Sequence, residues 1–526
     1  MQHTNQQTDG IALARLRPNW SRTMSAVTTV VTLSLIIATA IITRTLFLGA
    51  LGYNSDEAVY AGQGAAIAQI PVLNDLFPVF RAHPLLFQFL LAIEYKLFGM
   101  NDLTGRLTAA AIGVITVLLV FRIGDLLYGR RAGLYAALFM ALMPYHTIVS
   151  RQVLLDGPMT LFSTLALYTL VRFAQTERSE WLIATGAAMG LTFLSKETGI
   201  LMLGAVYAFL ALTPSIRTSL RAIAASTAVM LLMMAVFPLT VKLSGGGGDR
   251  TTGQYLIWQL FRRPNHEWSF YPTVVPPAIG LGLILLAVAG LWLMRHQNDW
   301  REKLLVAWIV VPLVFFELWP TKGFQYLLPI APAVALLAAR TAAHWHREDA
   351  RFGRRQLPGA WVGGALAVLV ASSLLISTLQ LISPRQSDTF LAGSGGIPGA
   401  LETGAWITKH SPEGSTFLAI GPSMANIVKY YGHRDAYGLS VSPNPLHRNP
   451  SYEPILNPDS DIRTGDIQYL VWDSYSAERT TFFSEKLLWY VNRYNGRVAH
   501  TESVSVTTPD GNVTQKPVII IYEVHP

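Results

Sequence analysis

Eleven apolar runs, most of them long enough to cross a membrane, occupy the first 383 residues of this 526-residue chain. About 20 apolar residues cross a bilayer as a helix. Only 14% of the residues are charged, against about 25% in soluble domains. We therefore predict an α-helical polytopic membrane protein with eleven spans, the fifth and sixth of them short, at residues 26–49, 103–126, 132–149, 157–174, 181–195, 198–213, 221–241, 274–294, 303–319, 324–340 and 360–382.

The run 84–98 has a different pattern, with Gln88, Glu94 and Lys96 at near-helical spacing. This spacing predicts an amphipathic helix that lies at the membrane interface. The first 25 residues are polar, and the apolar run after them is too long for the core of a signal peptide. We therefore expect an uncleaved first span.

Lysine and arginine are unevenly divided between the loops, and the loops rich in them face the cytoplasm. The richer set includes the N-terminal segment with Arg15, Arg17 and Arg22. We thus predict an integral protein of the cell (inner) membrane with a cytoplasmic N-terminus. We attribute the net charge of +8 to the basic loops that orient the spans, and we expect no nucleic-acid partner. The opposite, extracytoplasmic face receives the Asp56 loop, the loop 151–156, the Lys196-Glu197 turn, the loop 242–273, Lys322 and the C-terminal region.

The composition changes near residue 383, after which Pro, Gly, Asn and Asp become frequent and no spanning run follows. We predict two domains, a membrane domain at 1–383 and a small extracytoplasmic α/β domain at 384–526, a length that suffices for one domain. Residues 416–420 and 468–472 are typical of buried strands. Residues 424–431 predict a short helix, and 504–507 with 518–522 predict a terminal hairpin.

Two adjacent carboxylates, Asp56 and Glu57, follow the first span on its outer side. One interpretation is helix capping, with Ser55 or Asp56 at the start of a helix over 58–70. The other is catalysis, because an acid placed at the depth of lipid phosphates repels them unless cations neutralise it. A third acid, Asp156, lies on the same face between two spans, where it too has a capping or first-turn interpretation. We take all three as candidate catalytic residues.

Several basic side chains from different outer loops surround these acids in the predicted topology. A single cation near an interface usually snorkels toward water, but a group of them can bind a phosphate through charge and hydrogen bonds. We expect a phosphate- and substrate-binding set made of Lys196, Lys322, Arg81, His83, Arg151, Arg262, Arg263 and Tyr326. No His pair has the i, i+4 spacing of a helical zinc site, so no metal or other cofactor is indicated, although a divalent ion that His83 or His266 joins remains open.

A series of short motifs runs through residues 50–340. In chain order they are Asn54-Ser55-Asp56-Glu57-Ala58-Val59-Tyr60, Arg81-Ala82-His83-Pro84-Leu85-Leu86, Leu97-Phe98-Gly99, Gly105-Arg106-Leu107, Leu127-Tyr128-Gly129-Arg130-Arg131-Ala132-Gly133, Met143-Pro144, Ser150-Arg151, Asp156, Lys196 and Tyr326-Leu327-Leu328-Pro329. In these motifs and their order the chain resembles the GT-C superfamily of integral-membrane glycosyltransferases, most closely the branch of protein O-mannosyltransferases and the lipid A aminoarabinose transferase.

The resemblance implies transfer of one sugar from a polyprenyl-phosphate donor on the extracytoplasmic face. It implies Asp56 as the catalytic base, Asp156 as a residue that positions acceptor or base, and cations that hold the donor phosphate. His83-Pro84-Leu85 stands where many relatives have Lys-Pro-Pro, which leaves the phosphate contact of His83 open, with Arg81 or Lys322 as substitutes.

We therefore expect an inverting glycosyltransferase, whose partners are the lipid-linked donor, membrane lipids, and a glycan, glycolipid or protein acceptor. The alternative is a transporter or flippase of a lipid-linked substrate, which would need charges deep within the spans and repeated halves. A sensor with a ligand-binding C-terminal domain is a third class, but eleven spans exceed what an anchor needs.

Overall fold

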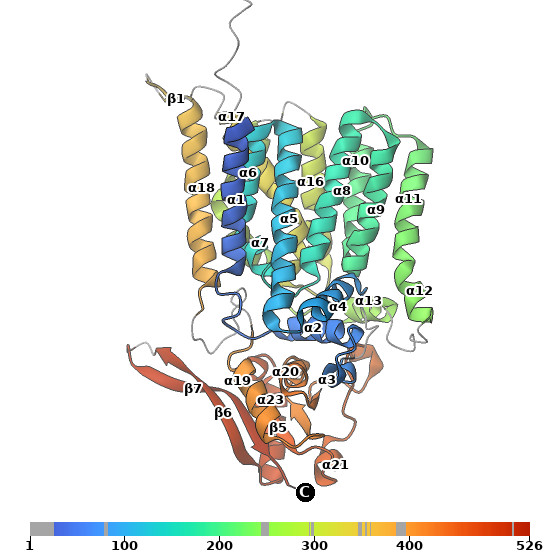
Figure 1. The fold of residues 1–526 in the computed structure, drawn as a ribbon, viewed down its shortest axis with the longest axis vertical. Helices are drawn as coiled ribbons and strands as arrows, with labels where there is room; N and C mark the ends of the chain where they lie inside the picture. The colour runs from blue at the N-terminus through green and yellow to red at the C-terminus, as the bar shows by residue number, and fades with distance from the viewer. Residues whose placement is uncertain are drawn as a thin grey trace, which may run out of the picture.

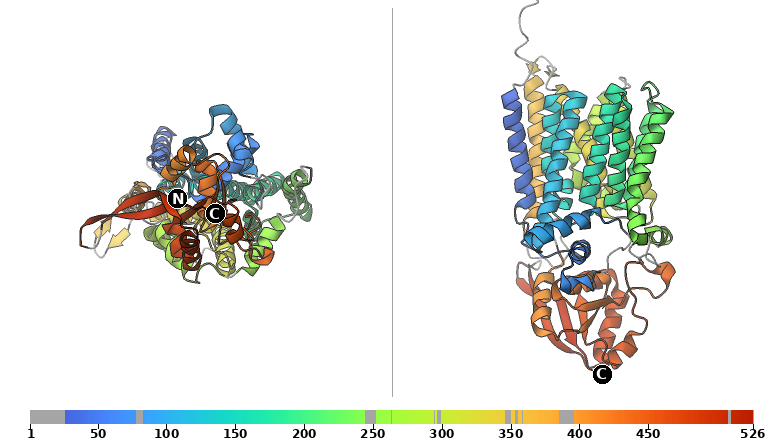
Figure 2. Two further views of the ribbon diagram at one scale, coloured as in Figure 1. Left: turned by 90° about the horizontal axis from the view of Figure 1, so that it is seen from below. Right: turned by 45° about the vertical axis from the view of Figure 1, so that its right-hand side comes forward.

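The computed structural model describes residues 26–77, 83–243, 252–262, 264–293, 295, 299–345, 350–352, 355–357, 359–384, 396–507 and 510–525. The chain forms two layers, an upright helix bundle and a smaller layer of strands and helices at one end of it (Figure 1). Short helices lie crosswise between the two layers, as the side views show (Figure 1, and the right-hand picture of Figure 2).

The bundle is built from long apolar helices. They are α1 (Ala26–Thr45), α5 (Asp102–Tyr128), α6 (Arg130–Leu142), α8 (Asp156–Thr176), α9 (Ser179–Ser195), the 3-10 helix η2 (Glu197–Leu201) with α10 (Met202–Leu212), α11 (Leu220–Met234) with α12 (Val236–Leu243), α14 (Phe270–Ile279) with α15 (Leu281–Leu293), α16 (Trp300–Leu318), the 3-10 helix η3 (Phe324–Ile330) with α17 (Ala331–Trp345), and α18 (Gly359–Ile382).

Every one of the eleven predicted spans falls largely on these helices. By length and apolar composition, five of the described helices can cross a membrane, and the pair α14 and α15, bent by 93°, would make a sixth. A polytopic membrane fold is therefore confirmed, whereas the number eleven stays a prediction. The predicted run 132–149 is interrupted, because α6 ends before Pro144 and a separate helix α7 (Pro144–Val149) follows. A residue before proline disfavours the helical conformation.

The crosswise helices are α2 (Ser55–Ile67), α3 (Pro71–Asn74), α4 (Leu86–Phe98) and α13 (Thr252–Phe261). Helix α4 matches the predicted amphipathic run at 84–98. Its Gln88 is buried and donates a hydrogen bond to the side chain of Gln63 on α2, at 3.0 Å. The polar face of α4 thus packs partly against the protein, and this pairing fixes α2, which carries Asp56.

The smaller layer is a five-stranded sheet in the order β4-β3-β5-β7-β6. Its strands are β3 (Thr416–Ala419), β4 (Asp435–Gly438), β5 (Tyr469–Asp473), β6 (Arg497–Thr507) and β7 (Val513–Glu523). Strand β3 pairs in parallel with β4 and β5, whereas β7 pairs antiparallel with β5 and β6. The predicted strands, helix and terminal hairpin all occur, the helix as α20 (Pro422–Gly432).

Further helices complete this layer, and a small hairpin lies outside it. The helices are α19 (Ala400–His410), the 3-10 helix η4 (Pro445–His447), α21 (Pro458–Arg463), α22 (Ser474–Arg479) and α23 (Thr481–Arg493), and the hairpin joins β1 (Ala350–Phe352) to β2 (Arg355–Leu357) between α17 and α18. The predicted domain boundary at 383/384 precedes residues 385–395, which lie outside the described residues, and it stays a prediction.

Helix α1 begins at the end of the bundle opposite the strand layer, and α2, α4 and α13 lie at the near end (Figure 1). The loops that sequence analysis assigned to one face therefore do gather beside the C-terminal layer.

Candidate active site

A cavity of about 100 Å³ lies where the bundle meets the C-terminal layer. It is lined from the membrane side by α2, α13, η2, η3 and the segment before α4, and from the other side by residues 449–452. The lining side chains include Asp56, Tyr60, His83, Lys196, Glu197, Tyr255, Tyr326, Asn449, Ser451 and Tyr452.

Asp56 stands in the first turn of α2, and its carboxylate lines this cavity, where the surrounding protein desolvates it. The helix is capped by Asn54, whose side-chain oxygen accepts hydrogen bonds from the backbone N–H groups of Asp56 and Glu57 at 2.9 and 3.0 Å. The predicted cap at Ser55 or Asp56 is therefore wrong. Because Asn54 does the capping, the carboxylate of Asp56 is left to face the cavity.

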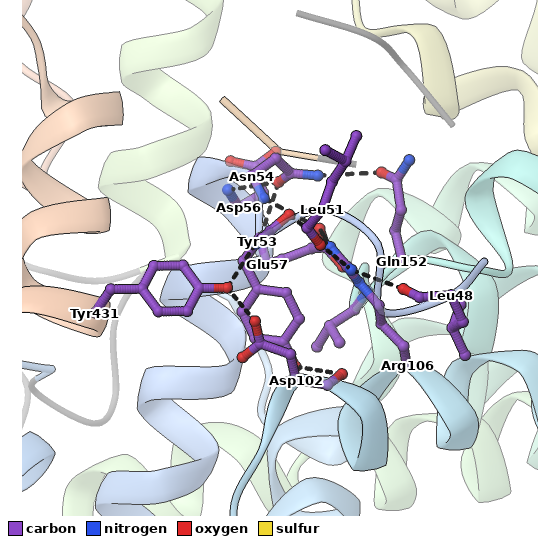
Figure 3. Close-up of polar contacts among 12 residues, drawn as sticks. Leu48, Leu51, Tyr53, Asn54, Asp56, Glu57, Asp102, Arg106, Gln152 and Tyr431 are labelled. Atoms are coloured by element: carbon purple, nitrogen blue, oxygen red, sulfur yellow. Dashed lines mark hydrogen bonds and ion pairs between the residues drawn. The ribbon is translucent and has the colours of Figure 1, made fainter. Parts of the chain in front are cut away.

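Glu57 turns the other way and is completely buried. Its carboxylate accepts hydrogen bonds from Arg106 Nε and Nη2, both at 2.9 Å, and from the backbone N–H groups of Asn54 and Val153 (Figure 3). Arg106 also donates to the carbonyl oxygens of Leu48, Leu51 and Gly52. Glu57 is absent from the cavity lining, and its contacts are those of a residue that anchors the Asp56 loop to α5.

Lys196 and Asp156 form a buried ion pair beside the cavity. Lys196 Nζ lies 2.8 and 2.9 Å from the two carboxylate oxygens of Asp156, the first residue of α8. Lys196 has extended backbone between α9 and η2, and its ammonium lies 4.5 Å from the centre of the Tyr326 ring. Although burial opposes the charge, the Asp156 carboxylate holds the pKa of Lys196 above its ordinary value.

His83 is held by the neighbouring carboxylate, Glu197. Its Nδ1 lies 2.8 Å from Glu197 Oε2, and its ring packs edge-on against Tyr255 and Tyr60 at 4.8 and 6.1 Å. Because an ionised carboxylate only accepts hydrogen bonds, this contact places a proton on Nδ1. The Nε2 atom is then available to a ligand in the cavity.

The other predicted cations lie elsewhere. Lys322 donates to Glu317 at 2.7 Å and packs against Trp268. Arg151 is buried and donates to the carbonyl of Thr43, and burial lowers its pKa to about 10. The exposed Arg262 stacks on Trp258, and the remaining two predicted cations, Arg81 and Arg263, lie outside the described residues. Lys196, His83 and Tyr326 are thus the members of the predicted binding set that line the cavity.

Sequence analysis missed Tyr60, Tyr255 and the segment 449–452 as parts of the site. Tyr60 ends the 54–60 motif one helical turn after Asp56, and this spacing could have placed it on the same face. Asn449, Ser451 and Tyr452 follow Asp56 by more than 390 positions in the chain, and no local pattern marks them. The described residues contain no group of three or more His, Cys, Asp or Glu side chains arranged to hold a metal ion.

The C-terminal layer also contacts the Asp56 loop directly, through α20. The hydroxyl of Tyr431 accepts a hydrogen bond from the backbone N–H of Tyr53 at 2.7 Å and donates to the carboxylate of Asp102 (Figure 3). Asn426 donates to the hydroxyl of Ser55 at 3.1 Å. These bonds tie the loop that carries Asp56 to a helix more than 370 positions away in the chain.

We expect Tyr431→Phe to loosen the Asp56 loop, because the Tyr53 amide and Asp102 both lose a partner. The cost should be about 1–3 kcal/mol of stability, with several-fold faster amide hydrogen exchange over 52–57. Tyr494→Phe is the matched control, since its hydroxyl binds Asp459 within the C-terminal layer. Unchanged exchange over 52–57 in Tyr431→Phe would contradict the tether.

Known proteins resemble the chain in sequence. Residues 82–241 match the family described as dolichyl-phosphate-mannose-protein mannosyltransferase. An undecaprenyl phosphate-alpha-4-amino-4-deoxy-L-arabinose arabinosyl transferase of Pectobacterium carotovorum is 24% identical over 76% of this chain and 75% of its own. A similarly named transferase of Sodalis glossinidius is 29% identical over 46% of each chain, so this chain spans about half its length.

Solved structures share the fold. ArnT from Cupriavidus metallidurans matches with a TM-score of 0.67 at 14% identity, over 95% of this chain and 98% of that one. The oligosaccharyltransferase of Archaeoglobus fulgidus matches with a TM-score of 0.60 at 13% identity, over 94% and 74%. The family match, the named relatives and the shared fold together support a membrane glycosyltransferase. Within that class they support a GT-C superfamily glycosyltransferase in the branch of the protein O-mannosyltransferases and the aminoarabinose transferases, the family that the motifs resemble.

Proposed function

We propose that the protein moves one sugar from a polyprenyl-phosphate donor to an acceptor hydroxyl, with inversion and with Asp56 as the general base. The observation that carries the proposal is the cavity in which the Asp56 carboxylate, the Lys196 ammonium and the His83 imidazole meet. ArnT from Cupriavidus metallidurans has been solved bound to undecaprenyl phosphate, and this supports a donor of the same class here.

In the proposed reaction the acceptor oxygen attacks the anomeric carbon while its proton passes to the Asp56 carboxylate. The bond between that carbon and the phosphate oxygen breaks, and its electron pair leaves on the phosphate. Lys196 and His83 then stabilise the charge that develops on the leaving phosphate. The proposed steps require no cofactor.

Inversion is supported by how the other acids are held. A retaining double displacement needs a second carboxylate positioned as nucleophile. Glu57 is bound by Arg106, Asp156 by Lys196, and Glu197 contacts His83. Of these four acids, Asp56 and Glu197 line the cavity. Because Glu197 is held by His83, we assign the role of base to Asp56. Asp156 acts in this proposal through Lys196, which it holds and keeps charged.

The proposed reaction takes place on the extracytoplasmic face of the inner membrane, with the N-terminus in the cytoplasm and the C-terminal layer outside. The basis is the excess of lysine and arginine in the loops at the far end of the bundle, together with the gathering of the candidate site and the C-terminal layer at the near end.

The test is transfer by the purified full-length protein in detergent micelles. We expect mass spectrometry to detect free polyprenyl phosphate and a glycosylated acceptor when an envelope extract is supplied with polyprenyl-phosphate sugars, and no product with nucleotide sugars. Movement of an intact lipid-linked sugar across proteoliposomes without sugar transfer would instead identify a flippase and overturn the proposal.

A further inference from the structure

A second cavity, of about 220 Å³, lies between α3 and the C-terminal layer. In Figure 1, α3 reaches down from the crosswise helices to the strand layer, beside α20. The cavity is lined by Asp75 from the membrane side and by polar side chains of α20, β4 and the following loop, namely Asn426, Lys429, Asp435, Tyr437 and Glu453. Neither sequence analysis nor the proposed reaction uses these residues.

The two cavities are neighbours. Ser451 and Tyr452 line both the second cavity and the one that contains Asp56. Asn426, in the second cavity, donates its hydrogen bond to Ser55, the residue directly before Asp56 in the chain. The two cavities therefore share a wall, and the second cavity lies on the C-terminal side of the site.

The chemistry of the lining favours hydroxyl and amino groups. Carboxylates and amides bind such groups through several hydrogen bonds, and the Tyr437 ring offers an apolar surface, with the Lys429 ammonium 5.5 Å from its centre. Asp75, Asp435 and Glu453 bring three formal negative charges against the single positive charge of Lys429. Such a surplus repels phosphate groups and attracts ammonium groups.

The size of the cavity also restricts the ligand. The cavity is smaller than pockets for drug-sized ligands, which typically measure about 300–1,000 Å³. A cavity of this size suits one or two sugar rings. A peptide would instead bind by adding a strand to a sheet edge. Strand β4 is an edge strand, but it is only four residues long.

We propose that the second cavity binds the acceptor as a neutral or amino-bearing saccharide unit, free of phosphate, and presents its hydroxyl to Asp56. This inference rests on the proposed function, since it assigns the acceptor of the same reaction. The carboxylates of Asp435 and Glu453 select against phosphorylated glycans, and the hydroxyl that enters the Asp56 cavity passes Ser451 and Tyr452.

The experiment is saturation-transfer NMR on the full-length protein with cellobiose, glucosamine and glucose 6-phosphate as probes. We expect transfer to cellobiose and glucosamine, and little to glucose 6-phosphate. In Asp435→Asn/Glu453→Gln the affinity for glucosamine should fall about tenfold, the loss expected from a charge-assisted hydrogen bond. Glu485→Gln, an exposed acid on α23, is the matched control and should bind like the wild type.

Stabilisation by undecaprenyl phosphate, measured as a shift of the unfolding temperature, is recorded for the same variants. It should be unchanged in Asp435→Asn/Glu453→Gln, which separates failure of this inference from failure of the proposed function. Equal binding of glucose 6-phosphate, or binding of a serine- and threonine-containing peptide in place of the sugars, would overturn the acceptor assignment and leave the donor assignment standing. Loss of the undecaprenyl phosphate shift in wild type would count against the proposed function alone.

Discussion

Asp56→Asn should reduce sugar transfer by about 10²–10⁴-fold, the usual contribution of a general base. Asparagine has nearly the same shape, accepts no proton, and leaves the Asn54 cap of α2 in place, because that cap uses backbone N–H groups. The measurement is the turnover of a polyprenyl-phosphate donor at saturating concentration. The apparent affinity for the donor should change much less, since the cations that face the phosphate remain.

The stability of Asp56→Asn separates a catalytic from a structural role. Burial raises the pKa of Asp56, and the opposing charges of Lys196 and His83 offset this only in part. A carboxyl whose folded-state pKa lies above its unfolded-state value lowers stability once the pH rises through that range, because the unfolded chain ionises more readily. Asparagine removes this penalty, so the variant should unfold at an equal or higher temperature at neutral pH. A clear loss of stability would indicate a structural role.

The same pKa shift predicts a pH dependence for the wild type. The reaction needs the ionised form of Asp56, so kcat/KM is full above the folded-state pKa and falls as the pH drops through it. Because burial raises that pKa, the fall should begin at a higher pH than the value of about 3.9 for an ordinary aspartate would give. This acidic limb should be missing from the residual activity of Asp56→Asn, and its persistence would assign it to another group.

The helices and the position of Asp56 could be predicted because each depends on a short stretch of sequence. An apolar run of bilayer length forms a helix wherever it lies, since its backbone must bond internally in lipid. The helix break at Pro144 could also have been predicted from the sequence, because proline disfavours the helical conformation of the residue before it. The cap at Asn54 was missed although the spacing of Asn54 and Glu57 is that of a capping box.

The partners of the cations could not be predicted, because they come from distant parts of the chain. Arg151 donates a hydrogen bond to the carbonyl of Thr43, 108 positions earlier, so the side chain of a residue predicted to bind phosphate points into the protein instead. His83 meets Glu197 across 114 positions. The sequence shows that a buried cation will need a partner, because an unpaired buried charge is unfavourable. Only the three-dimensional fold decides which residue becomes that partner.

Arg106→Ala should be among the most damaging changes away from the cavity. It would leave Glu57, completely buried, without its counter-charge, and three carbonyl oxygens of the loop before α2 without their donor. Removing one partner of a buried ion pair costs about 3–5 kcal/mol. We expect a corresponding fall in the free energy of unfolding in detergent, together with loss of activity, since the loop that carries Asp56 loses its attachment to α5.

Two further variants serve as controls for Arg106→Ala. Arg178→Ala breaks a fully exposed pair with Glu180 and should leave stability almost unchanged, because exposed pairs contribute little. Arg106→Lys keeps the charge but cannot reach the carboxylate and the carbonyls together with one ammonium, so it should lie between Arg106→Ala and the wild type. If Arg106→Lys were as stable and active as the wild type, the charge of Arg106 rather than its several hydrogen bonds would hold the loop, and the anchoring role assigned to its guanidinium would be wrong.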